Sequence, residues 1–283
     1  MKCRSICVVT VSWELVNKYT KLHCGIVALA TAFVLSLTIG VPAFGAAITT
    51  GDGGGADVWI SSGHGNKSFN PQCSDCFLEA RHTKYGSRHT YLRWDLSELS
   101  GVVTNANMKI MVGFAQNSTV DVNMAVWGLN DGHAGEGWGE TTTTWNNAPG
   151  NDTTTHSSGD ITPHTVLIAS QVTQLGTLTA SSGIAAGDIL TFSSAALDSF
   201  INADTDDQVT LILTNLDDPS LETSVQLMEK ETPDTIVPST GLTYAPTLDL
   251  PGMEIPEPTS FVLLGLGLVG LLTSRRRGTC QQA

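Results

Sequence analysis

The chain has 283 residues and a formal net charge of −13, from 14 Lys and Arg against 27 Asp and Glu. Between Ala46 and Pro258 only 7 basic residues stand against 26 acidic ones, so this part carries −19. Such a body repels the phosphates of nucleic acid, whose binding depends on Lys and Arg, and we expect no nucleic-acid partner. The same acidity is compatible with calcium as a cofactor.

The N-terminal 45 residues have the pattern of an export signal. Four basic residues precede a stretch without charge at 25–41, and Pro42 ends that stretch. The small residues Ala43 and Gly45 then occupy the positions that a signal peptidase reads. We therefore predict a signal peptide over residues 1–45, with an uncleaved membrane anchor as the alternative.

The C-terminus has a second apolar segment. Residues 259–274 contain no charge, and as a helix these 16 residues span about 24 Å, which is shorter than the roughly 30 Å core of a bilayer. Arg275, Arg276 and Arg277 follow, and positive residues stay on the cytoplasmic side. We expect a short, transient transmembrane helix with the preceding chain outside the cell.

Pro256, Glu257 and Pro258, the apolar segment and the Arg run resemble, in this order, the PEP-CTERM sorting signal of Gram-negative bacteria. The resemblance implies recognition by an exosortase, cleavage near Pro256-Glu257-Pro258, and release from or attachment to the cell surface after passage through the inner membrane. The family is linked to exopolysaccharide and biofilm. The GxGxxG pattern at 265–270 lacks the strand and acidic partner of a nucleotide site.

The middle of the chain alternates apolar and polar residues with a period of two. Residues 46–55 are small and Gly-rich and predict a flexible lead-in. Strands are expected at 57–60, 90–96, 108–114, 120–127, 189–192, 209–214, 224–228 and 246–250, and one helix at 194–202. This pattern predicts an all-β jelly-roll β-sandwich over residues 56–250. A linker at 251–258 follows it, and the sandwich is flanked by an N-terminal signal-peptide helix and the C-terminal transmembrane helix at 259–283.

Several segments in order resemble the DNRLRE domain. They are Ala56-Asp57-Val58-Trp59-Ile60, 88–97, 105–110, 126–129, Trp138-Gly139-Glu140, Thr144-Trp145-Asn146-Asn147-Ala148-Pro149, 225–229 and 245–248. The resemblance covers roughly residues 50–250. It implies a jelly roll of the kind found as accessory modules on secreted polysaccharide-degrading enzymes, and extracellular polysaccharide, in some members alginate, as the ligand.

Four residues are candidates for a ligand site. Trp138, Glu140 and Trp145 offer stacking faces and a carboxylate for sugar hydroxyls, although a buried structural pin is the favoured interpretation of this segment. Trp127 lies on the opposite side of its strand from Met124 and Val126, so it is a candidate stacking platform for a sugar, and packing under a loop is the other interpretation.

Other polar residues allow structural interpretations beside functional ones. Cys73 and Cys76 favour a disulfide in an exported protein, with a redox pair, free thiols or a zinc site shared with His82 and His89 as alternatives. Arg93 and Asp95 favour structural ion pairs. Five acidic residues could bind calcium or form solvated loops, namely Asp204, Asp206, Asp207, Asp217 and Asp218.

No HExxH, GxSxG or P-loop motif occurs in the chain, and we predict that the protein is not an enzyme. The leading hypothesis is an exported, surface-sorted protein that binds or organises extracellular polysaccharide. A structural envelope or matrix protein without a glycan site is one alternative, and a polysaccharide lyase or hydrolase is another.

Overall fold

A computed structural model describes residues 45–69, 77–83, 86–116, 119–133, 135–153, 167–231 and 244–254. All of them belong to the second of two compact units, residues 44–283. The expected signal peptide, the sorting residues from Pro256 onward, and Cys73 and Cys76 lie outside these ranges. Within these ranges, no helix is long and apolar enough to cross a membrane.

The described chain is built almost entirely of strands. They are β1 (Ala46–Thr49), β2 (Ala56–Ser61), β3 (Leu78–Thr83), β4 (Gly86–Asp95), β5 (Ser100–Gly101), β6 (Asn107–Gln116), β7 (Val122–Leu129), β8 (Val172–Ala180), β9 (Ile189–Phe192), β10 (Gln208–Asn215), β11 (Ser224–Leu227), β12 (Thr247–Leu250) and β13 (Met253–Glu254). Three short helices join them, η1 (Ser62–His64), α2 (Ala195–Asn202) and η2 (Pro219–Leu221).

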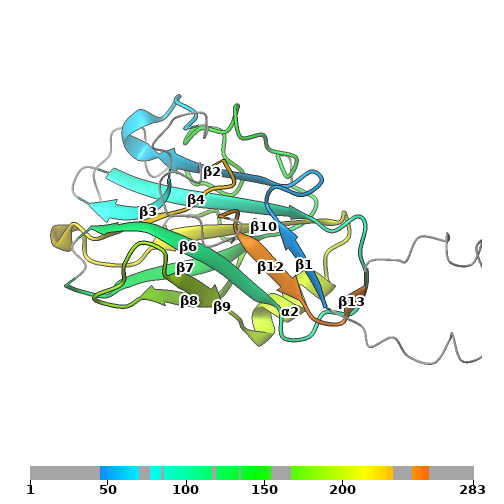
Figure 1. Ribbon diagram of the computed structural model, residues 1–283. Helices are drawn as coiled ribbons and strands as arrows, with labels where there is room; N and C mark the ends of the chain where they lie inside the picture. The colour runs from blue at the N-terminus through cyan, green and yellow to red at the C-terminus, as the bar shows by residue number, and fades with distance from the viewer. Residues whose placement is uncertain are drawn as a thin grey trace, which may run out of the picture. The chain divides into compact units, whose positions relative to one another are not determined.

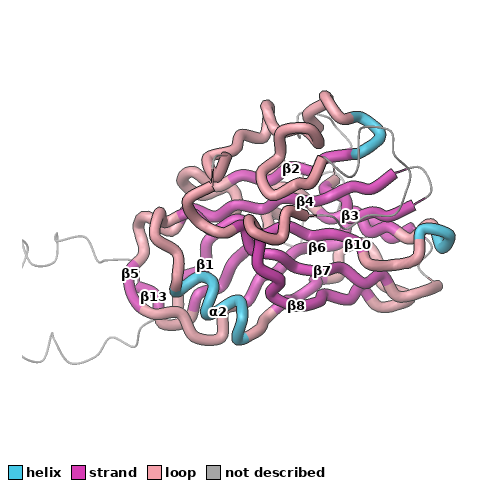
Figure 2. The backbone as a smooth tube through the Cα atoms, turned by 180° about the vertical axis from the view of Figure 1, so that it is seen from behind, coloured by secondary structure: helices cyan, strands magenta, loops and turns pink. Residues whose placement is uncertain are grey.

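The strands pair antiparallel in the order β1-β12-β6-β11-β3-β4-β10-β7-β8, with β2 also paired to β4 and β9 to β6. Figure 2 shows β2, β4, β10, β7 and β8 following one another in one layer. The other half of the path, with β6, β12 and β1, lies in front of it in Figure 1. Inward side chains of both halves form one apolar core, which confirms the predicted all-β sandwich.

Alternation along the strands produces this core. Leu92 and Trp94 of β4 and Met108 and Ile110 of β6 are all buried in it, as the period of two predicts. Helix α2 packs on the sandwich through Leu197 and Ile201, which are buried in the main core. The helix begins after Ser194, whose side chain accepts a hydrogen bond from the Leu197 N–H at 3.0 Å.

Residues 46–55 are not wholly a flexible lead-in, and this prediction is wrong for their first part. Ala46–Thr49 form β1, in which Ala46 pairs with Leu250 and Thr49 with Thr247. Figure 1 shows β1 beside β12. Backbone pairing along β12 orders this small, apolar segment, which has too few side chains to give a recognisable period.

The outer face of the β2-β4-β10-β7 layer carries a second apolar cluster. Val58 and Ile60 of β2, Tyr91 of β4 and Ile212 of β10 are buried there although they point away from the main core. Segment 138–148 covers them with two Trp rings. Side chains on both faces of these strands are therefore buried.

Candidate functional site

Trp138 and Trp145 are buried, with 5% and 2% of their surface exposed. The Trp138 indole N–H donates to Thr210 Oγ1 at 3.2 Å, and its ring meets the Tyr91 ring edge-on at a centroid distance of 5.9 Å. Trp145 packs against the His89 ring at 4.8 Å. Neither indole face is open to a sugar, so both rings pack as the structural pin predicts.

Glu140 holds the same segment to β2. Its Oε1 accepts a hydrogen bond from the Asp57 N–H at 3.0 Å and forms an ion pair with Lys230. The Ser68 hydroxyl donates to the Glu140 carbonyl at 2.6 Å. A carboxylate that accepts a backbone N–H is what the structural interpretation of Glu140 predicts.

Arg93 and Asp95 stabilise loops through backbone groups. Arg93 lies over the Trp138 ring, 5.0 Å from its centroid, and donates to the Trp138 carbonyl at 2.6 Å and to the Gly54 carbonyl at 2.9 Å. Asp95 accepts from the N–H groups of Gly54 at 2.7 Å and Ser97 at 3.0 Å. Their role is structural, with loop backbone as the main partner.

Trp127 differs from the sequence expectation in its exposure. The ring does point away from Met124 and Val126, which lie in the main core. It is half-buried, however, because it packs against the second apolar cluster, and its indole N–H donates to Thr214 Oγ1 at 3.0 Å. The predicted alternative of packing under a loop describes Trp127 better than a free platform.

A pair of aromatic rings that the sequence did not single out lies at the end of β2. Trp59 and Phe69 stack with centroids 3.7 Å apart and planes 20° apart, and both are half-buried. Lys67 lies over the Phe69 ring at 4.7 Å, and Arg88 over the Trp59 ring at 4.5 Å. We call Trp59, Lys67, Phe69 and Arg88 the aromatic patch.

The aromatic patch combines two properties that suit a sugar ligand. The half-buried rings can contact the C–H groups of a pyranose with their edges, and the Lys67 ammonium and Arg88 guanidinium can donate hydrogen bonds to its hydroxyls. Side chains alternate along β2, so Trp59 lies on the opposite side of the strand from Val58 and Ile60. This alternation could have identified Trp59 as a candidate site residue from the sequence. The partnership with Phe69, ten residues later in a loop, has no sequence signal.

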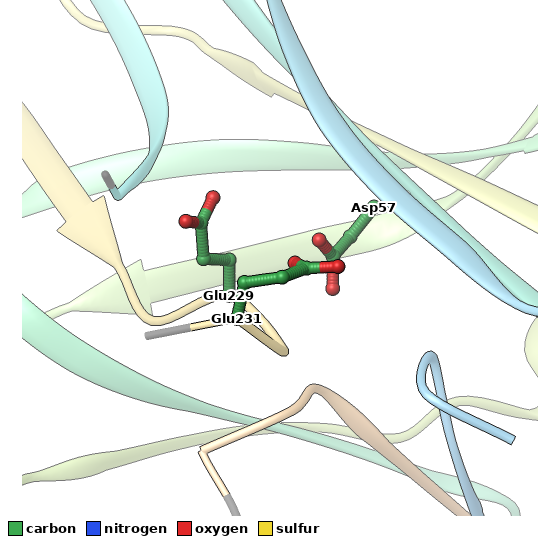
Figure 3. Close-up of side chains that lie close together, drawn as sticks. All are labelled: Asp57, Glu229 and Glu231. Carbon is green, nitrogen blue, oxygen red and sulfur yellow. The ribbon is translucent and has the colours of Figure 1, made fainter. Parts of the chain in front are cut away.

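Three carboxyl groups meet between β2 and the segment after β11. Asp57 and Glu229 are buried and Glu231 is exposed, and one oxygen of each lies within 4.8 Å of the others. Figure 3 shows the Glu231 side chain extending from this segment to the Asp57 carboxylate on β2, whereas the Glu229 carboxylate points away from Asp57. Burial raises the pKa of Asp57 to about 6, of Glu231 to about 7 and of Glu229 to about 9, and the neighbouring carboxylates add to each shift.

A second carboxylate group joins only two of the five acidic residues proposed for calcium. Asp204 and Asp206 lie with Asp131, which the sequence did not single out. Burial and the charges of Asp131 and Asp206 raise the pKa of Asp204 to about 7. The Asp207, Asp217 and Asp218 side chains are not part of this group.

Asp218 caps helix η2, and Asp217 connects neighbouring segments through hydrogen bonds. Asp217 accepts from the Asn123 N–H at 3.2 Å and from the Thr223 hydroxyl at 2.9 Å, and Asp218 accepts from the Ser220 N–H at 2.8 Å at the start of η2. His82 binds the Asp217 carbonyl through Nδ1 at 2.8 Å. Among the described residues, neither His82 nor His89 joins two other ligands close enough to share a metal.

Two open hollows in the described surface flank α2. The larger, of about 450 Å³, is lined by Asn130, Asp131, Thr173, Ser199 and Phe200 among others. The smaller, of about 280 Å³, lies beside Met253 and includes Asp204 and Asp207. A lyase or hydrolase needs a deep cleft with convergent catalytic groups, and these two hollows are open to solvent.

Comparison with known families defines the class of the domain. Residues 55–184 match carbohydrate-binding module family 96, and the DNRLRE domain is of this type, so the resemblance drawn from the sequence is confirmed. The described fold is all-β, and residues 55–184 of it are similar to a carbohydrate-binding module. No curated protein matches the chain.

A second match identifies the chain more closely. Residues 254–277 match the PEP-CTERM protein-sorting motif, which confirms the resemblance of this segment to that sorting signal. The chain thus has a PEP-CTERM sorting motif and a segment that matches family 96, and the two matches indicate an exported bacterial cell-surface protein. Neither matched segment is a catalytic domain.

Proposed function

We propose that this protein binds extracellular polysaccharide of the biofilm matrix at the surface of a Gram-negative bacterium and catalyses no reaction. The match of residues 55–184 to a carbohydrate-binding module carries the proposal. Signal peptidase removes residues 1–45, and an exosortase cleaves near Pro256 after transient anchoring by 259–274. The start of β1 at Ala46, directly after the expected cleavage position at Gly45, supports removal of the signal peptide.

The aromatic patch is the proposed glycan contact. Trp138, Trp145 and Glu140 hold a loop to the sheet, and Trp127 packs against the second apolar cluster and is hydrogen-bonded to Thr214 of β10. The stacked Trp59–Phe69 pair keeps partial exposure and has two cationic groups beside it. Such a surface can hold a sugar ring by packing and hydrogen bonds, and it offers no acid–base pair for cleavage.

The test is affinity electrophoresis of the full chain in gels that contain neutral polysaccharides. Trp59→Ala should lose retention, with affinity reduced on the order of tenfold, because removing a packed aromatic face costs about 1 kcal/mol or more. Thermal melting of the variant establishes that the fold is retained.

Phe114→Ala is the matched control. Phe114 is an aromatic residue of β6 with 55% of its surface exposed, far from β2 in the strand order. Its loss should leave retention unchanged. A wild-type protein with no retention on any glycan and with concentration-dependent self-association would favour the structural matrix protein instead.

A further inference from the structure

The cluster of Asp57, Glu229 and Glu231 connects parts of the chain that are distant in sequence. Asp57 belongs to β2, whereas Glu229 and Glu231 follow β11. One carboxylate oxygen of each lies within 4.8 Å of the others. This separation is about twice a Ca²⁺–oxygen bond of 2.3–2.6 Å, so one ion placed between the oxygens could contact all three.

The two oxygens of Asp57 have different environments. Its Oδ2 accepts hydrogen bonds from the Thr50 hydroxyl at 2.6 Å and from the Lys230 N–H at 3.2 Å. Its Oδ1 is buried and has no hydrogen-bond partner among the described residues. Asp57 has no exposed surface, and a fully buried oxygen without a partner is costly unless something else compensates it.

Among the described residues, the Lys230 ammonium lies beside the cluster and is shared between Glu140 and Glu231. The Lys230 ammonium pairs with Glu140, lies 3.3 Å from the Gly55 carbonyl, and is 3.7 Å from the nearest oxygen of Glu231. The ammonium thus pairs directly with two carboxylates, and its charge also acts on Asp57 and Glu229. Burial and the charges of neighbouring carboxylates raise the pKa values of Asp57, Glu229 and Glu231, because both disfavour the ionised form of each group.

We infer that Asp57, Glu229 and Glu231 bind one calcium ion. Asp57 contributes its Oδ1, and the hydrogen bonds to Oδ2 hold the carboxylate in place, as outer partners of metal ligands commonly do. Exposed Glu231 provides the entry from solvent, and water completes the oxygen shell that Ca²⁺ prefers. The inference does not rest on glycan binding.

The site would join the two layers of the sandwich at the β2 edge. A ligand that binds the folded chain and not the unfolded chain stabilises it by mass action. Calcium should therefore raise the melting temperature of the full chain progressively with concentration, and a chelator should reverse the rise.

The experiment measures Ca²⁺ binding to the full chain by calorimetry, with Tb³⁺ luminescence as a second probe. We expect one ion per chain in the wild type. Glu231→Gln should weaken binding at least tenfold, and because this residue is exposed the variant should fold. Asp57→Asn should abolish binding.

The control is Asp206→Asn, in the other carboxylate group with Asp131 and Asp204. It should leave the calcium affinity unchanged. The inference is overturned if the wild type binds no calcium, or if Asp206→Asn removes binding while Glu231→Gln keeps it. Either result leaves the glycan assay with Trp59→Ala unaffected, so failure of the two proposals can be told apart.

Discussion

The charge state of single buried carboxyl groups depends on neighbours that lie far away in sequence. Asp204 is near Asp131, and Asp57 is near Glu229. Alternation placed the buried apolar residues of β4, β6 and β7 correctly because their environment depends on local chain direction. No local pattern could bring Asp57 together with a residue beyond β11, or Trp59 together with Phe69.

Asp204 provides a pH-dependent prediction at this scale. Its pKa of about 7 in the folded state lies above the ordinary value of 3.8, so the folded chain binds this proton more tightly than the unfolded chain does. The stabilising effect is fully present below about pH 4 and is lost as the pH rises through about 7. Asp204→Asn imitates the protonated carboxyl and should raise the melting temperature at pH 8 while changing little at pH 5.

Thermal melts of wild type and Asp204→Asn at the two pH values check this prediction. Asp198→Asn is a contrasting variant, because Asp198 accepts hydrogen bonds from the Asn105 and Ala106 N–H groups at 2.9 and 2.7 Å and should be destabilised at pH 8. An equal effect of Asp204→Asn at both pH values would show that its charge is not the cause.

At the scale of elements, the sequence predicted strands where apolar residues alternate regularly with polar ones, and missed strands where this alternation is interrupted. Strand β8 was missed because a bulge opposite Val126 and Trp127 skips one residue. Leu175 and Leu178, which both point into the main core, therefore stand three apart rather than two, whereas Val172 faces the second apolar cluster. Strand β3 was missed because Glu79 and His82 are buried polar residues within it.

The segment from Trp138 to Pro149 has no regular secondary structure, yet its two indoles cover the outer face of a sheet. Trp145→Ala should destabilise the domain by roughly 3–5 kcal/mol, as removal of a fully packed Trp does. In a domain of this size the melting temperature should fall on the order of 10 °C. Calorimetric melting checks this prediction. The melting temperature of Phe114→Ala should fall by far less, because the Phe114 ring is exposed.

At the scale of the whole molecule, the charge of −19 between Ala46 and Pro258 restricts the ligand. Long-range repulsion opposes an acidic polysaccharide unless salt or a divalent cation screens it, although Lys67 and Arg88 form a local exception at the aromatic patch. The fold class and the sorting signal followed from the sequence because both depend on composition and order along the chain.

We therefore expect binding to neutral glycans with or without calcium, and binding to a polyanion such as alginate only with calcium. Affinity electrophoresis with calcium or chelator distinguishes the cases. Tight retention on a polyanion in the presence of chelator would show that the local cations of the patch outweigh the net charge.

The pairing of β1 with β12 restricts where the N-terminal signal can be cleaved without exposing a strand edge. Its four residues pair with β12 and so cover the backbone groups along one side of that strand. An uncovered strand edge is a template for pairing with another chain and hence for aggregation. Cleavage after Gly45 leaves β1 whole, whereas cleavage a few residues later would expose β12. If signal peptidase cleaves after Gly45 as we propose, the position of the cut keeps β12 covered and protects the chain from associating with its own copies.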